Sequence, residues 1–250
     1  MSKGRRTAFI IFSLFLIACL VALGSWQIQR MQWKRQLITN SKAAVTAKPV
    51  SANDIAAGAE YGYDVDWLRI RLSGSYRHDL ERYIYAPGKA GLGYQVITPF
   101  IDDSGFLLFV DRGWVSVANK NPKTRKNLRQ PEGKITIIGI TRLHEPGLTL
   151  FLPAADTGKN VWYWYDRQTL AASLPAGIGK SADGQLPIIS PVFVQLEPGG
   201  EPGEGVWPKV AAVEINLPDN HLQYAITWFT LALFMLAMLV IFLRANKKAE

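Results

Sequence analysis

Hydrophobic residues gather at the two ends of the chain and leave a mixed stretch of roughly 200 residues between them. Residues 7–24 and 224–243 contain no charged side chain. Because an α-helix rises about 1.5 Å per residue, segments of this length cross a hydrocarbon core roughly 30 Å thick. The pattern therefore predicts two transmembrane helices, 7–24 and 224–243, arranged as a hairpin that flanks one domain, 25–223.

The period of the hydrophobic pattern changes along the middle stretch. Residues 26–48 are polar and tolerate a helix, so we expect the first helix to extend past the membrane until Pro49 ends it. Residues 50–63 are expected to form a loop. From Leu68 onward apolar and polar residues alternate, as in a strand with one wet face. The strands are expected near 68–73, 83–85, 94–101, 106–117, 134–143, 192–196 and 210–217.

Turn residues separate these strands and complete the predicted fold. The four residues 102–105 predict a hairpin turn, and Asp166 is expected to cap a short helix that ends near Ser173. About seven strands with one helix predict an antiparallel β-rich, small barrel-like α+β domain.

Basic residues flank both apolar segments on their outer sides, at Lys3, Arg5 and Arg6 and at Arg244, Lys247 and Lys248. Such residues stay in the cytoplasm, so both termini are expected to be cytoplasmic and the domain extracytoplasmic. The two tails account for most of the formal net charge of +8, which argues against nucleic-acid binding.

The N-terminal segment has a second interpretation, a cleaved signal peptide, because Ala22-Leu23-Gly24 loosely resembles a cleavage site. The segment is longer than a usual signal core, and the second span needs a first one to keep both ends inside. No Arg-rich presequence precedes it, so a mitochondrial precursor is disfavoured. We expect a two-span protein of the bacterial cell inner membrane with a periplasmic domain.

The composition excludes several kinds of chemistry. The single cysteine, Cys19, lies within the first predicted span, so neither a disulfide nor a thiol metal site is expected. Only three histidines occur, and His78 and His144 are expected to be surface residues at strand ends. No hydrolase, metalloprotease or nucleotide-binding motif is present, and the acidic residues of the domain form no recognisable pair. We therefore expect no enzymatic activity.

The outer end of the first span carries Trp26, Arg30 and Trp33, which share one helical face. One interpretation is an interfacial tryptophan belt with a basic collar. The other is that Arg30 pairs with an acidic group at the membrane surface, such as a carboxylate of a bound cofactor.

The second span begins with an aromatic segment in which His221, Ala225 and Trp228 share a face and Tyr224 lies beside them. A histidine that enters a span needs a partner or a cavity, and imidazole is a common ligand of haem iron. The alternative is an interfacial histidine bonded to water or to a backbone carbonyl. The aromatic segment 160–166 also stands out, as a docking surface, a ring-stacking wall or core, of which core packing is favoured.

Seven segments together resemble the surfeit locus protein 1 family, the assembly factors of cytochrome c oxidase. In chain order they are LGSWQIQRMQWK at 23–34, GYQVITPF at 93–100, VDRGWV at 110–115, NPKTR at 121–125, IIGITR at 137–142, the spaced residues Asn160, Trp162 and Asp166, and NHLQYAITWF at 220–229.

The resemblance implies a non-enzymatic factor that helps to place haem a in subunit I of the oxidase, beside the haem a synthase. It makes His221 the candidate ligand of the haem iron. Contacts from Trp228, Tyr224, Arg30 and Trp26 to a transiently bound haem a are a hypothesis. The alternative is a membrane scaffold that docks oxidase subunits without binding haem. Whether the chain forms a homo-oligomer, and whether it serves a cytochrome c or a quinol oxidase, stays open.

Overall fold

The structure is a computed structural model that describes residues 3–88, 91–143, 152–181, 184–211 and 220–247. It divides into two compact units, one formed by residues 1–40 with 215–250 and the other by residues 41–214. Each unit is described by itself.

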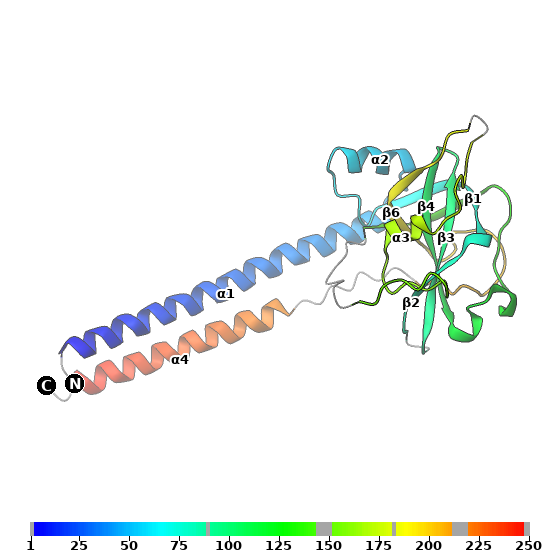
Figure 1. Cartoon of the computed structure of the whole chain (residues 1–250). Helices are drawn as coiled ribbons and strands as arrows, with labels where there is room; N and C mark the ends of the chain where they lie inside the picture. The colour runs from blue at the N-terminus through cyan, green and yellow to red at the C-terminus, as the bar shows by residue number, and fades with distance from the viewer. Residues whose placement is uncertain (1–2, 89–90, 144–151, 182–183, 212–219, 248–250) are drawn as a thin grey trace. The chain divides into compact units, whose positions relative to one another are not determined.

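The first unit is a pair of antiparallel helices, α1 (Lys3–Thr46), of which residues 41–46 are assigned to the second unit, and α4 (His221–Lys247) (Figure 1). Near the termini the rings of Phe9 and Phe242 lie 4.7 Å apart. At the other end Gly24 packs against Phe229, and a Cβ on this glycine would lie 2.8 Å from that ring. Gly24 therefore lets the two helices approach closely, as small residues do between membrane helices.

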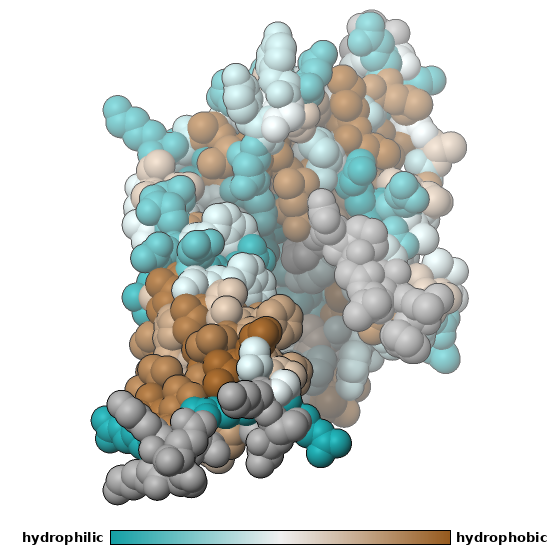
Figure 2. Space-filling view, turned by 90° about the vertical axis from the view of Figure 1, so that its left-hand side faces the viewer, coloured by the Kyte–Doolittle hydropathy of each residue, from teal (hydrophilic) through white to brown (hydrophobic). Residues whose placement is uncertain are grey.

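Both helices are long and apolar enough to cross a membrane. Figure 2 shows apolar side chains gathered on this unit, with hydrophilic ones at the end that carries the termini. The predicted extension of the first helix is confirmed, because α1 ends at Thr46, three residues before Pro49. The second helix begins at His221, three residues before the predicted span.

The second unit contains a closed β-barrel with short helices around it (Figure 1). The strands lie in the order β1-β5-β6-β4-β3-β2, and pairing of β1 with β3 closes the first five into a ring. Fully buried residues such as Ile70, Phe100 and Val194 form the core. The strands are β1 (Arg69–Tyr76), β2 (Arg82–Tyr85), β3 (Gly93–Asp102), β4 (Phe106–Ser116), β5 (Ile135–Arg142) and β6 (Ile188–Leu196).

The helices of this unit are short. They are α2 (Ala52–Glu60), η1 (His78–Leu80), η2 (Val117–Asn119), η3 (Pro122–Thr124) and α3 (Arg167–Ala172). The predicted cap of α3 is confirmed, because the Asp166 side chain accepts hydrogen bonds from the backbone N–H groups of Gln168 and Thr169.

Two expectations need correction, and a third is tested only at its first two residues. The sheet is not wholly antiparallel, because β6 pairs in parallel with β4 after a long connection from β5. Residues 50–63 are not all loop, because Ser51 and Asp54 form a capping box that begins α2, whose Ile55 is buried. The strand expected at 210–217 falls mostly outside the described residues. Its first two residues, Val210 and Ala211, are described and are not in a strand. The described residues contain six strands.

Barrel closure depends on a glycine. Gly74 pairs with Asp102 of β3 on one side and with Ile135 of β5 on the other. A Cβ at this position would lie 2.0 Å from the backbone carbonyl oxygen of Ile101. A side chain here would therefore separate β1 from β3.

We expect Gly74→Ala to destabilise the barrel by about 1–3 kcal/mol or more, because the backbone of β3 has to move away. The measurement is urea unfolding of the full chain in detergent. Gly158→Ala is the matched control, since its Cβ would only make an ordinary contact of 3.5 Å with Asp156. Equal unfolding midpoints for the two variants would contradict this account of barrel closure.

Candidate functional site

A hydrogen bond between the two long helices positions the predicted ligand His221. Its Nδ1 lies 2.8 Å from Oε1 of Gln27 on α1, and the histidine is half-buried as the first residue of α4. An amide oxygen can only accept, so Nδ1 donates the hydrogen. In a neutral imidazole the lone pair then resides on Nε2, the nitrogen that would ligate a metal.

Trp228 and Tyr224 lie on the same side of α4 as His221. The buried Ala225 marks the side of this helix that faces α1. At about 100° per residue, His221, Trp228 and Tyr224 are displaced from Ala225 in the same direction around the helix. Trp228 is half-buried, and Tyr224 is 53% exposed. The three side chains therefore form one lateral surface of the helix pair.

The two residues predicted on α1 are placed differently. The buried Gly24 and Met31 mark the side of α1 that faces α4, and Gln27 lies at its edge. Arg30 is displaced on the same side as Gln27, but Trp26 lies about 150° from the buried stripe. Trp26 is 54% exposed. Arg30, about 110° from that stripe, lies nearer to the histidine surface than Trp26 does, but the two residues are only about 40° apart on α1, as their i,i+4 spacing requires.

Arg30 stacks on a neighbouring ring. Its guanidinium carbon lies 3.9 Å from the ring centre of Trp33, and both residues are exposed. This stacked pair is compatible with an interfacial collar and with a cation held ready for an acidic group. The roles predicted for Trp26 and Arg30 stay predictions.

These residues fit a haem better than a bare metal ion. Among the described residues no group of three or more His, Cys, Asp and Glu side chains could hold a metal. A haem brings four ring nitrogens of its own, so one oriented imidazole is a sufficient protein ligand. His221 provides one such oriented imidazole.

Gln27 was missed by the sequence analysis. Its signal is weak because it stands between Trp26 and Arg30, residues of more conspicuous chemistry. Its position along α1 could have indicated its role, because it follows Gly24 by three residues and precedes Met31 by four. This spacing places Gln27 beside the face that packs on α4. Sequence alone does not supply the pairing of α1 with α4 that makes this register meaningful.

The barrel unit contains a second polar cluster, centred on Arg112 of β4. Arg112 is fully buried and forms a two-pronged ion pair with Glu201, at 3.1 Å from Nε and 3.0 Å from Nη2. Arg129 lies 2.9 Å from the same carboxylate. Burial alone would lower the pKa of Arg112, but Glu201 and other neighbouring groups outweigh it and raise the pKa.

Glu81 extends this cluster. It forms an ion pair with Arg125 at 3.0 Å, and Tyr83 donates a hydrogen bond of 2.9 Å to the same carboxylate. Arg112 lies 3.7 Å from Glu81. The segments VDRGWV and NPKTR thus supply Arg112 and Arg125 to one buried network that joins β4 to the surrounding loops.

His78 corrects the expectation of a surface residue. It is half-buried, with Nδ1 at 3.1 Å from Nη1 of Arg112 and Nε2 at 2.9 Å from the carbonyl oxygen of Pro131. Arg112 can only donate, so Nδ1 accepts and Nε2 donates, and the imidazole is neutral. Burial and the charge of Arg112 lower the pKa of His78. The other histidine expected at the surface, His144, lies outside the described residues.

The aromatic segment 160–166 is core at Val161 and Trp162 and half-buried elsewhere. Trp162 is 1% exposed and packs with Ile84, Phe109 and Leu170. Its indole N–H donates to the hydroxyl of Thr169 at 3.0 Å. The favoured interpretation is therefore confirmed for Trp162.

Comparison with known proteins gives a consistent result. The model of the SURF1 family matches residues 14–233. The SURF1-like protein of Monosiga brevicollis is 32% identical over 235 residues, which cover 89% of this chain and 82% of that protein. Surfeit locus protein 1 of Homo sapiens is 29% identical over 250 residues (92% and 76%). The SURF1-like protein of Rickettsia conorii is 28% identical over 252 residues (96% and 92%).

We expect Arg112→Met to destabilise the barrel by about 3–5 kcal/mol, because Glu201 loses its two-pronged partner inside the protein. The double variant Arg112→Met/Glu201→Leu should not recover that loss, since it also removes the counter-charge of Arg129, which lies 2.9 Å from Glu201. Urea unfolding of the two variants and the parent measures both effects. A single variant as stable as the parent would show that the ion pair is dispensable.

The lowered pKa of His78 predicts a specific sensitivity to acid. The unfolded chain binds a proton at His78 near pH 6.5, whereas the folded chain does so only at lower pH. Stability from this residue is therefore complete above about pH 6.5 and is lost as pH falls towards the folded pKa. We expect His78→Gln to lose less stability than the parent between pH 7.5 and 5.5 in urea titrations. If the parent and His78→Gln lost equal stability over this pH range, the lowered pKa of His78 would be refuted as a source of acid sensitivity.

Proposed function

Because this chain belongs to the SURF1 family, we propose that it is an assembly factor for haem-copper cytochrome c oxidase. Its task is to assist the delivery of haem a to subunit I, with transient haem binding at the membrane surface. Family membership and the two candidate membrane helices support this proposal. It acts as a chaperone, and no reaction is assigned to it.

We place the protein in the bacterial cell inner membrane. The apolar helices α1 and α4 cross the bilayer, and the basic residues beyond their apolar parts hold both termini in the cytoplasm. The barrel unit then belongs to the periplasm. The His221 end of α4 is the end remote from the C-terminal basic residues, so it lies at the periplasmic side of the membrane.

The hydrogen bond between His221 and Gln27 is the observation that carries the haem proposal. A bound haem a would supply an iron that can take one imidazole nitrogen as a protein ligand. Gln27 holds the tautomer in which Nε2 of His221 is the ligating atom. Tyr224 and Trp228 offer aromatic surface beside it, and Arg30 offers a cation for a propionate.

A single histidine suits a carrier that must release its cargo. Two histidine ligands would bind haem more firmly, as in electron-transfer proteins, and would oppose transfer. Among the described residues of the helix pair, His221 is the one histidine. The proposed partners are therefore a haem a synthase on the donor side and oxidase subunit I on the acceptor side, both within the lipid bilayer.

The test is the visible spectrum of the detergent-purified protein after co-expression with haem a synthesis. We expect the parent to retain haem a and His221→Ala to lose nearly all of it. Gln27→Leu should weaken binding by about tenfold or more, since partners that orient a ligating histidine typically contribute that much. Leu222→Ala, a change at the next and exposed position of the helix, is the matched control and should match the parent.

Two outcomes would count against the proposal. If His221→Ala retained as much haem as the parent, the ligand would have to be elsewhere. If the folded, well-expressed parent were colourless, the alternative of a scaffold that docks oxidase subunits without haem would be the better account.

A further inference from the structure

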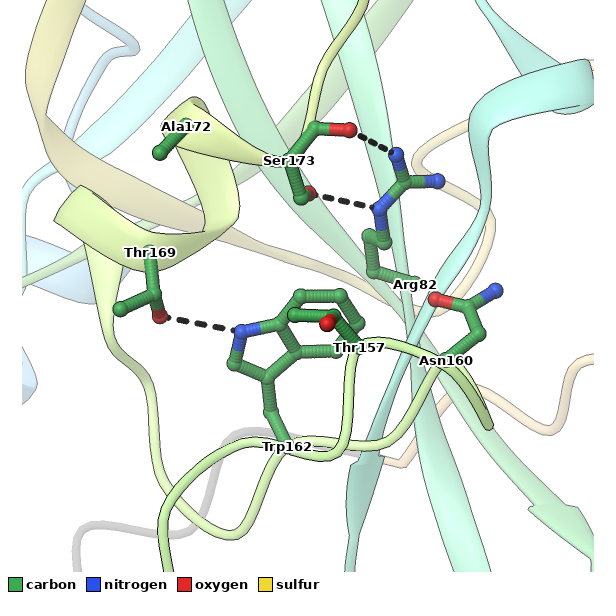
Figure 3. A pocket seen from close by; sticks show the side chains of 7 residues that line it. All are labelled: Arg82, Thr157, Asn160, Trp162, Thr169, Ala172 and Ser173. Carbon is green, nitrogen blue, oxygen red and sulfur yellow. Dashed lines mark hydrogen bonds between the residues drawn. The ribbon is translucent and has the colours of Figure 1, made fainter.

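A pocket of about 540 Å³ opens in the barrel unit beside α3 (Figure 3). Arg82, the first residue of β2, lines it together with Trp162 and Ser173. The remaining lining residues are small or polar, namely Thr157, Asn160, Thr169 and Ala172. Its volume lies within the range of small-molecule sites, roughly 300–1,000 Å³.

Arg82 is a cation without a carboxylate partner among the described residues. Its Nε and Nη2 donate to Oγ and the carbonyl oxygen of Ser173, at 2.9 Å and 2.8 Å. Its Nη1 donates to the carbonyl oxygens of Leu80 and Glu81. All four acceptors are neutral. Nη2 carries a second N–H, because a guanidinium has five donors.

The surroundings of Arg82 differ from those of its neighbours. Arg77, five residues earlier, forms a two-pronged ion pair with Asp79, which raises its pKa. The half-buried Arg82 has its pKa lowered, chiefly by loss of solvent, although the charge of Asp79 acts in the opposite direction. Its positive charge is thus partly withdrawn from water and hydrogen-bonded to neutral oxygens, and no carboxylate among the described residues forms an ion pair with it.

Asn160 supplies a second feature that points to a ligand. Its Nδ2 donates to the carbonyl oxygen of Glu81 at 2.8 Å, but its buried Oδ1 accepts no hydrogen bond. The residue holds a left-handed backbone conformation, with φ of 54°, which positions its side chain beside Arg82 (Figure 3). An unsatisfied acceptor next to an uncompensated cation fits a ligand that has both an acidic group and a hydrogen-bond donor.

From these contacts we infer that the pocket is a binding site for a carboxylate that carries an N–H or O–H group nearby. One arginine compensates one negative charge, so a monoanionic carboxylate fits better than a phosphate dianion. Arg82 faces the carboxylate, and Asn160 Oδ1 accepts from the adjacent donor. Either a small acid or an acidic side chain of a polypeptide offers this chemistry. The inference is independent of haem binding.

The test uses the full chain in detergent and follows the indole N–H resonance of Trp162, which lines the pocket. N-acetylglycine is the small probe, and acetyl-Gly-Glu-Gly-amide is the polypeptide probe. Uncharged N-acetylglycinamide and inorganic phosphate, each at matched ionic strength, are the ligand controls. We expect a saturable shift with a carboxylate probe and none with either control. The probe that binds more tightly identifies the source of the carboxylate.

Two variants test the residue assignment. Arg82→Gln should weaken binding at least tenfold, and Arg71→Gln, at an exposed position of β1 away from the pocket lining, is the matched control that should leave it unchanged. Ala172→Asp places a carboxylate at an exposed position of the pocket wall, and it should abolish binding without disturbing the core. The inference is overturned if neither probe gives a saturable shift, if the shift persists in Ala172→Asp, or if phosphate binds as tightly.

Discussion

The barrel unit depends on one buried guanidinium. Arg112 projects from β4, a strand that is paired on both sides, and its side chain is entirely excluded from solvent. A charge in that position is tolerated only with close counter-charges and saturated hydrogen bonds. Glu201, Glu81 and His78 meet that requirement, and each comes from outside the closed ring of strands. The position of Arg112 therefore dictates where these connecting segments have to lie.

Such a network of buried charges fixes the arrangement of the connecting loops more than it adds to the net stability of the barrel. An apolar cluster of the same volume would often hold the barrel equally well, since desolvation offsets most of the attraction within a buried ion pair. The observed arrangement of the loops, however, pairs both carboxylates with arginines. Arg125 and Arg129 add two further cations against the two carboxylates, which leaves an excess of positive charge. Burial and this excess of positive charge together favour the neutral state of His78 in the same cluster.

The sequence predicted the features that depend on local pattern. The two apolar helices, the length of α1, the hairpin between β3 and β4 and the cap of α3 all follow from periodicity, turn residues or capping residues. The barrel-like domain was predicted from the number and spacing of the strands, but the pairing of β1 with β3 that closes it and the parallel pairing of β4 with β6 join residues distant in the chain, so local pattern does not specify them. The residues of the α2 capping box, Ser51 and Asp54, are recognisable in the sequence, but the small residues around them favoured the prediction of a loop.

The candidate site also combines residues that local pattern identifies with residues that only the tertiary structure identifies. Sequence identified His221 by its residue type and its place at the start of an apolar helix, but it could not identify Gln27, whose role exists only when α1 and α4 pair. The same holds for Arg82. As a residue in a strand it resembles any solvated arginine, and only the folded chain shows that its partners are neutral oxygens. A charged side chain that lacks an ion-pair partner indicates a binding site, and only the tertiary structure shows whether a partner is present. Arg112 and Arg82 show this within one barrel, because the first is matched by Glu201 from its own chain and the second by no carboxylate among the described residues.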